Sequence, residues 1–194
     1  MRASRRLAEG PCPHRYTARV NATPYLVEIG RALAVARLEA VLIGNAAAAL
    51  QGAPVTTVDF DFLFRKTPRN LQKLKVFADE LRALVLRPFY PMSELYRVTR
   101  DDGLQVDFMG TVHGLRSFEG VRDRADMLEI GGVTVTVASL GDVIKSKRAA
   151  RRPRDLAVLE VLEQAHAERQ RGRKATGQGR PARRPAPRKR SRPA

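Results

Sequence analysis

Two aspartates, Asp59 and Asp61, stand one residue apart in the segment TTVDFDFLF, residues 56–64. Side chains alternate faces along a strand, so the aspartates share one face while three phenylalanines share the other, which predicts a core face. The two carboxylates then lie about 6–7 Å apart at their Cα atoms. At that separation their charges repel, and burial would remove their hydration. A bound cation would relieve both penalties, and so would solvent if this were an edge strand with a wet face.

A third aspartate, Asp107, has the same setting in LQVDFMG, residues 104–110. Its neighbours Val106 and Phe108 point to one face of the expected strand, and Asp107 points to the other. If this strand lies beside the strand 57–64, three carboxylates converge on one patch of sheet. Carboxylate oxygens favour Mg²⁺ or Mn²⁺, which proteins bind through a few carboxylates together with substrate phosphates.

The histidines and the cysteine form no comparable cluster in the sequence. They are scattered, which disfavours a zinc site: His14, His113, His166 and Cys12. The chain also has no GxxxxGK[ST] phosphate loop. The aspartates are therefore the residues whose types and spacing best fit chemistry.

A glycine precedes the aspartate pair at the point where a strand is expected to turn into a helix. The apolar run EAVLIG, 39–44, predicts a buried strand, and NAAAALQG, 45–52, predicts a short alanine helix closed by Gly52. Gly44 at this turn would let the backbone approach a phosphate, and the helix start offers free N–H groups. A phosphate cradle beside a metal-binding pair is what transfer of a nucleotidyl group requires.

These residues need a sheet to hold them, and the hydrophobic pattern predicts one. The expected elements are, in order, a helix from Pro24, strand 39–44, helix 45–52, strand 57–64, helix 67–81, a hairpin of 94–98 and 104–110, a diglycine hairpin 127–137, a helix from Ser139 and a last helix from Asp155. This order predicts an α+β fold with a mixed sheet, helices packed largely on one side of it, and C-terminal helices.

Together these motifs resemble the minimal nucleotidyltransferases of the DNA polymerase β-like superfamily, in particular the branch related to AbiEii-type toxins. The resemblance rests on VLIGNAAAALQG (41–52), TVDFDFLF (57–64), VDF (106–108) and SLGDVIKSKRAARRPRDLAVLEVL (139–162), and it covers roughly residues 25–165. It implies a nucleotidyltransferase-like sheet and transfer of a nucleoside monophosphate from an NTP to a hydroxyl group.

The resemblance also implies roles for single residues. The three aspartates would bind Mg²⁺ or Mn²⁺ and carry the catalysis: Asp59, Asp61 and Asp107. The nucleotide would be bound by Gly44, Asn45, Thr57, Lys147, Arg152 and Asp155, among which Gly44 and Asn45 hold the triphosphate and Lys147 contacts a phosphate. The acceptor would be an RNA end, a protein or a small hydroxylated molecule, and the toxin relationship implies a partner antitoxin.

Two residues depart from the family pattern and keep an alternative open. Asn45 replaces the small second residue of the turn, and Val55 stands where many relatives have arginine. Either change implies altered substrate choice or a chain that has become an inactive nucleotide- or RNA-binding module. A D-x-D glycosyltransferase is disfavoured, because the chain is short for that class and has no nucleotide-binding βαβ repeat.

The net charge of +16 is concentrated at the C-terminal end. Residues 166–194 hold 11 of the 36 Lys and Arg residues and a single acid, Glu168, with many Pro and Gly. This composition predicts a loose lead-in over 1–23, a folded domain over 24–167 and a disordered Arg/Pro-rich tail over 168–194. The tail would either hold RNA phosphates by counterion release or remain a solvated extension.

The expected location is the cytoplasm. The single cysteine, Cys12, has no partner for an intrachain disulfide, and the N-terminal residues lack the order of a signal peptide. The most apolar region, 32–50, is interrupted by Arg37 and Glu39 and does not predict a membrane span.

Overall fold

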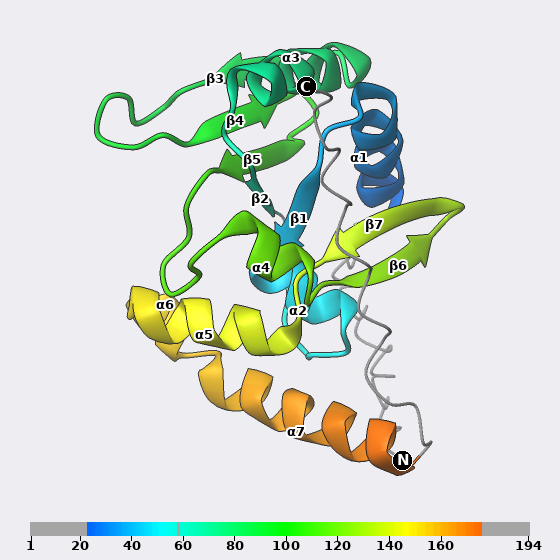
Figure 1. Ribbon diagram of the computed structural model, residues 1–194, viewed down its shortest axis with the longest axis vertical. Coiled ribbons are helices and arrows are strands. Elements are labelled where there is room, and N and C mark those ends of the chain that lie inside the picture. The colour runs from blue at the N-terminus through cyan, green and yellow to red at the C-terminus, as the bar shows by residue number, and fades with distance from the viewer. Residues whose placement is uncertain (1–22, 58, 176–194) are drawn as a thin grey trace, which may run out of the picture.

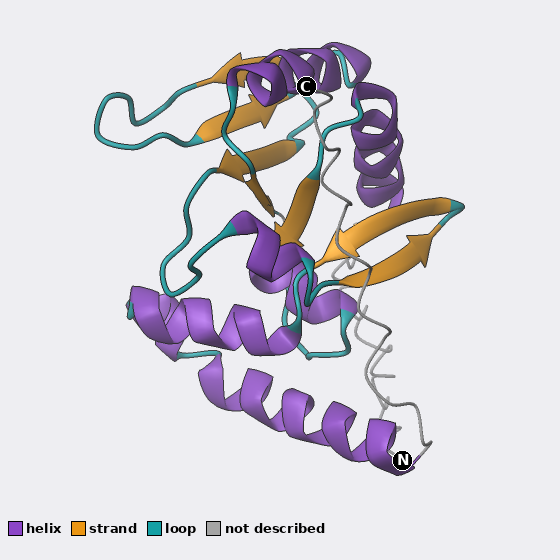
Figure 2. Cartoon of the chain, viewed as in Figure 1, coloured by secondary structure: helices purple, strands orange, loops and turns teal. Residues whose placement is uncertain are grey.

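The structure is a computed structural model, and it describes residues 23–57 and 59–175. Its centre is a seven-stranded mixed sheet in the order β3-β4-β5-β2-β1-β7-β6 (Figures 1 and 2). The strands are β1 Ala40–Ile43, β2 Phe60–Phe64, β3 Leu84–Leu86, β4 Tyr96–Thr99, β5 Gln105–Met109, β6 Asp126–Ile130 and β7 Val133–Val137. The pairs β2–β5 and β1–β7 are parallel, and the other neighbours are antiparallel. The predicted α+β class with a mixed sheet is confirmed.

The helices are α1 Thr23–Ala36, α2 Gly44–Leu50, α3 Pro68–Glu80, α4 Phe118–Arg122, α5 Leu140–Ala150, α6 Pro153–Leu156 and α7 Leu159–Ala175. Figure 1 shows α1 and α3 together at one end of the sheet, and α2, α4, α5 and α7 gathered at the other. None of the helices within the described ranges is long and apolar enough to cross a membrane.

The aromatic face of β2 forms the centre of the core. Phe60, Phe62 and Phe64 are all buried, as their alternation predicts. The Phe62 ring stacks on Phe108 of β5 at 5.4 Å, and Phe77 of α3 meets Phe108 edge-on at 5.1 Å. Helix α3 therefore covers the phenylalanine face, which leaves the aspartates on the opposite face. Because β2 lies between β5 and β1, it is not an edge strand.

Local capping signals in the sequence set the starts of two helices. The side chain of Thr67 accepts a hydrogen bond from the Asn70 backbone N–H at the start of α3, with proline as the first helical residue. Ser139 does the same for Asp142 at the start of α5. Both starts, the predicted hairpins β4–β5 and β6–β7, and the short helix after Gly44 agree with the sequence prediction.

Two elements, β3 and α4, were not expected from the sequence. They have three and five residues, too few to show a period. Helix α4 is fixed to the end of β2 by Arg65, whose guanidinium pairs with Glu119 at 2.7 Å and lies over the Phe118 ring. A short helix can thus be held by tertiary contacts that leave no local signal.

The last predicted helix is divided, and it extends beyond its predicted end. Arg152 and Pro153 begin α6, and α7 continues to Ala175, so residues 168–175 of the predicted tail are helical. Arg169 and Arg173, one turn apart, both pair with Asp126 of β6, at 2.8 and 3.2 Å. Residues 1–22 and 176–194 of the predicted lead-in and tail lie outside the described residues.

Candidate active site

The sheet register brings the predicted aspartates to one place. Asp61 of β2 lies directly opposite Asp107 of β5 in a parallel pair, and opposite Ile43 at the end of β1. Gly44 follows Ile43 and begins α2, whose first turn has no side-chain cap. Neighbouring strands lie about 4.8 Å apart. The backbone therefore gathers Gly44, Asp61 and Asp107 at the end of β1.

Gly44 is required at this position for two independent reasons. Its φ of +69° is a left-handed conformation that L side chains rarely adopt. A Cβ built on it would lie 2.7 Å from Asp61 Oδ2, closer than any ordinary contact. The missing side chain thus lets the backbone of this turn pack directly against the Asp61 carboxylate.

Asp61 is the most perturbed carboxyl group of the site. Burial first, and then the like charges of Asp107 and Asp59, raise its pKa from the ordinary 3.8 to about 6. The positive charges of Arg154 and Lys147 oppose this rise. Negative charge is therefore in excess around Asp61, which is the condition that a bound cation would relieve.

Asp107 has a cationic partner that sequence reasoning missed. Arg97 lies opposite Asp107 on β4 and donates two hydrogen bonds, Nε to Oδ1 and Nη2 to Oδ2, both at 2.8 Å. This fork raises the pKa of Arg97 above its ordinary value. The predicted hairpin with its DDG turn contained the signal, because its register places residue 97 opposite residue 107.

Asp59 lies just before β2 and is exposed. The hydroxyl of Thr57 accepts a hydrogen bond from the Asp59 backbone N–H and donates one to the Asp59 carbonyl, both at 3.2 Å. Gln105 Nε2 donates to Asp59 Oδ1 at 3.4 Å. Thr57 therefore shapes the turn that carries Asp59, and Gln105 is the described contact of the Asp59 carboxylate.

Asn45, the second residue of the turn, carries an unpaired polar atom. Its Oδ1 is buried, and no hydrogen-bond donor among the described residues reaches it. A buried acceptor without a donor costs about 1–3 kcal/mol. A ligand hydroxyl or N–H group beside Gly44 would satisfy it.

The predicted late residues separate into a buried pair and exposed cations. Lys147 Nζ donates to Asp155 Oδ1 at 3.0 Å, and both residues are buried. Arg152 is the exposed residue before α6. The arginine whose charge acts on Asp61 is Arg154, two positions later. The sequence prediction named Arg152 and did not single out Arg154.

The donor set fits a divalent cation bound with substrate phosphate. The charge of Asp59 acts on Asp61, which lies against Gly44, and Mg²⁺ commonly uses one or two carboxylates with phosphate oxygens. Within residues 23–57 and 59–175, no three His, Cys, Asp or Glu side chains form a ready-made metal cage. Both oxygens of Asp107 are turned to Arg97 instead.

Comparison with solved structures places the chain among nucleotidyltransferase folds. The structure of ANT(2'')-Ia in complex with adenylyl-2''-tobramycin matches with a TM-score of 0.52 at 14% identity, over 79% of this chain and 98% of that one. The lincosamide antibiotic adenylyltransferase LnuA matches with 0.52 at 11%, over 72% and 95%. A putative nucleotidyltransferase from Thermotoga maritima matches with 0.50 at 20%, over 84% and 99%. At these identities the likeness shows the fold. No curated protein sequence matches the chain significantly.

The sequence itself matches one family model, described as a nucleotidyl transferase of unknown function (DUF2204), over residues 23–175. This match includes the glycine turn, all three aspartates and the Lys147–Asp155 pair. It bears out the superfamily that the motifs resemble, while the AbiEii-related branch stays a prediction. The chain belongs to the DUF2204 family and is a nucleotidyl transferase.

Proposed function

We propose that this protein transfers a nucleoside monophosphate from an NTP to a hydroxyl group, with the help of a divalent cation held by Asp59 and Asp61. The observation that carries the proposal is the meeting of Gly44 with Asp61. There a glycine with a left-handed backbone lies directly against a carboxylate whose pKa is raised to about 6. A backbone turn that approaches a carboxylate with two further aspartates acting on it suits a cation with its phosphate ligands.

In this proposal different residues bind the cation, bind the nucleotide and accept the proton. Asp59 and Asp61 bind the cation, which when bound would neutralise charge on the triphosphate and on the leaving pyrophosphate. The backbone at Gly44 and the Asn45 side chain hold the nucleotide. The acceptor oxygen attacks the α-phosphorus, the bond to pyrophosphate breaks, and Asp107 orients the attacking hydroxyl and takes its proton on an oxygen that Arg97 has given up.

Arg97 acts in this scheme as a positioning residue for Asp107. Its planar fork fixes both carboxylate oxygens, so the carboxylate has one orientation relative to Asp61. Asp107 would reach a cation only after Arg97 gives up at least one oxygen. Lys147 and Arg154 contribute positive charge toward the carboxylates, and Asp155 keeps Lys147 in place.

The acceptor is proposed as one of three classes: an RNA end, a protein or a small hydroxylated molecule. ANT(2'')-Ia and LnuA, which share the fold, are an antibiotic-resistance factor and an antibiotic adenylyltransferase, which gives the small-molecule class a precedent. The relationship to AbiEii-type toxins, an antitoxin partner and a cytoplasmic location belong to the same proposal.

The experiment is transfer from α-labelled NTPs. Each of the four NTPs is incubated with Mg²⁺, the protein and whole-cell extract, and labelled RNA, protein and small molecules are then separated. We expect one labelled class with wild-type protein and none with Asp59→Asn/Asp61→Asn. The control Asp79→Asn/Glu80→Gln removes two exposed charges from the far end of α3 and should keep full activity. Absence of product with every NTP would contradict the proposal.

The alternative is a member of this family that binds nucleotide or RNA and has lost catalysis, and two observations favour it. Arg97 occupies both oxygens of Asp107, and Val55 stands at the position where an arginine is usual in relatives. Such a protein would bind nucleotide or RNA and release no pyrophosphate. The same incubations decide between the two, because pyrophosphate release can be measured for every NTP.

A further inference from the structure

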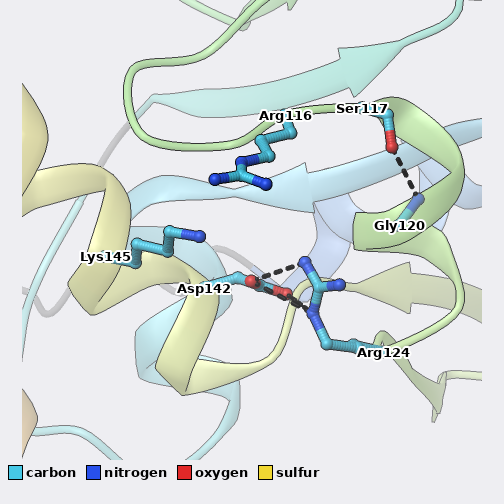
Figure 3. A pocket seen from close by; sticks show the side chains of 6 residues that line it. All are labelled: Arg116, Ser117, Gly120, Arg124, Asp142 and Lys145. Carbon is cyan, nitrogen blue, oxygen red and sulfur yellow. Dashed lines mark hydrogen bonds and ion pairs between the residues drawn. The ribbon is translucent and has the colours of Figure 1, made fainter.

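A second charged site lies between α4 and α5. It is a pocket of about 180 Å³ lined by Arg116, Ser117, Gly120, Arg124, Asp142 and Lys145 (Figure 3). Arg154 and Lys147 are the cations whose charges act on Asp61, and none of the three pocket cations is among them. The cations of this pocket are thus different residues from those whose charges act on Asp61.

One of the three cations is fixed in place by a buried carboxylate. Asp142 is 5% exposed and accepts hydrogen bonds from Arg124 Nε at 3.0 Å and Nη2 at 2.9 Å. Asp142 Oδ2 also accepts from the Ser139 hydroxyl at 3.0 Å. The remaining nitrogen, Arg124 Nη1, lies where a Cβ on Gly120 would be 3.4 Å away, at the pocket lining. This pair is neutral as a unit and holds a free guanidinium N–H group toward the pocket.

The side chains of the other two cations are unpaired within the described ranges. None of the described residues forms a hydrogen bond or ion pair with the Arg116 guanidinium or the Lys145 ammonium group. Figure 3 shows both side chains pointing into the space in front of the Arg124–Asp142 pair. The Ser117 hydroxyl accepts from the Gly120 N–H at 3.1 Å, so its own hydrogen remains free to donate. The pocket thus presents a surplus of two positive charges and several unused donors.

We infer that this pocket binds one phosphate group of the acceptor molecule, separate from the NTP. A phosphate offers several oxygen acceptors to guanidinium and ammonium donors, and such charge-assisted bonds are the strong ones. The volume is below the roughly 300–1,000 Å³ of pockets that enclose whole ligands, so it suits a single group with the rest of the molecule outside. The inference rests on the proposed function, because it names a feature of the acceptor.

The elements that form the pocket also connect it to the carboxylates. Arg116 is on the segment that follows β5, the strand that carries Asp107. Lys145 is on α5, two residues before Lys147, whose charge acts on Asp61. Gly114 packs so closely on α5 that a Cβ there would lie 2.9 Å from the Lys145 carbonyl oxygen. A phosphate held in the pocket would therefore have a fixed position relative to β5, which carries Asp107, and to α5, which carries Lys147.

The first test is a titration with inorganic phosphate at constant ionic strength, followed by the backbone amide NMR signals. We expect saturable shifts at Gly120 and Lys145 in the wild type, and affinity weakened about tenfold or more in Arg116→Ala/Lys145→Ala, since two charge-assisted contacts are lost. The matched control Arg69→Ala/Lys75→Ala removes two exposed cations from α3 and should bind like the wild type. Shifts that never saturate, or equal affinity in the pocket variant, would overturn the inference.

The second test distinguishes the molecules that could supply the phosphate. It also shows whether the inference holds if the proposed function is wrong. Ribose 5-phosphate and a short RNA are each compared with and without their terminal phosphate. A terminal phosphate that raises affinity only when Arg116 and Lys145 are present supports the inference, from whichever ligand it comes.

Binding of Mg²⁺–NTP should be the same in the pocket variant as in the wild type. If the pocket variant loses NTP binding, the pocket serves the NTP and the inference is wrong. If even the wild type binds no NTP, the proposed function fails while the phosphate titration still decides the pocket.

Discussion

Two arginine–aspartate pairs in this protein have nearly the same geometry in opposite surroundings. Arg97 holds Asp107 with two bonds of 2.8 Å, and Arg124 holds Asp142 with bonds of 3.0 and 2.9 Å. Both aspartates are buried, 7% and 5% exposed. The first pair stands beside Asp59 and Asp61, which leaves an excess of negative charge. The second stands beside Arg116 and Lys145, which leaves an excess of positive charge.

The difference teaches that a buried ion pair alone does not indicate what a site binds. Each pair is neutral, and its net contribution to stability is small, because desolvation offsets attraction. The unpaired charges around it decide the ligand: a cation with phosphates near Asp107, and a phosphate near Asp142. Variants that change one pair and leave the other intact therefore distinguish a role in protein stability from a role in ligand binding.

The largest expected effect comes from filling the space beside Asp61. Gly44→Ala should lower nucleotidyl transfer by about 100-fold or more, because a methyl group at 2.7 Å from Asp61 Oδ2 must displace the carboxylate. Gly52→Ala is a matched control, since Gly52 has φ +92° but nothing within 4 Å of its Cβ position. Both variants should lose about 1–2 kcal/mol of unfolding free energy from the left-handed backbone. Equal loss of activity in both would show that backbone strain, and not the space at Asp61, is responsible.

The next effect distinguishes the two pairs directly. Arg97→Gln and Arg124→Gln each leave an aspartate buried without its cation, so both should destabilise the protein, Arg97→Gln by about 2 kcal/mol and Arg124→Gln by about 1. The second is smaller because the Arg124 side chain is 47% exposed, against 27% for Arg97. Only Arg97→Gln should tighten Mn²⁺ binding, by roughly tenfold, since it frees a third carboxylate. Denaturant unfolding and Mn²⁺ titration measure the two effects. Tighter Mn²⁺ binding in Arg124→Gln would contradict the assignment.

The smallest effect concerns the charge of Asp61 in the metal-free protein. Its pKa is raised to about 6 in the folded state, so ionisation is easier in the unfolded chain, and wild-type stability falls between about pH 4 and pH 6. Asp61→Asn cannot ionise and should be more stable than the wild type in EDTA at pH 7.5, by about 1–2 kcal/mol, which is below the roughly 3 kcal/mol of the full shift because Asp61 is only partly buried. Below pH 4 the two should be equal. An advantage that is the same at pH 3.5 and pH 7.5 would rule out the charge as its cause.

The sequence predicted much of this fold because its signals are local. The alternation of Asp59 and Asp61 with phenylalanines gave the faces of β2, and Thr67 and Ser139 marked the starts of α3 and α5. Gly44 was predicted as a close-approach residue from its place at a strand-to-helix turn. Each of these depends on spacings of two to four residues, which a single sequence displays directly.

The parts that were not predicted depend on distant pairings. Arg124 meets Asp142 across 18 positions, and Arg169 meets Asp126 across 43. The charge of Arg154, and not that of Arg152, acts on Asp61, and this difference depends on the turn of α6. The basic composition of the C-terminal residues is equally consistent with solvated side chains. Only the tertiary structure shows that Arg169 and Arg173 hold α7 in place through their ion pairs with Asp126.

The most direct test of the central claim is Mg²⁺-dependent NTP binding measured by calorimetry. Wild type, Asp59→Asn/Asp61→Asn and the control Asp79→Asn/Glu80→Gln are titrated with each NTP, once with Mg²⁺ and once with EDTA. We predict that at least one NTP binds the wild type and the control only with Mg²⁺, and that the aspartate variant loses this binding while its unfolding transition remains cooperative. NTP binding of the same affinity in the aspartate variant, or binding that is unchanged by EDTA, would contradict the claim that these two carboxylates hold the cation.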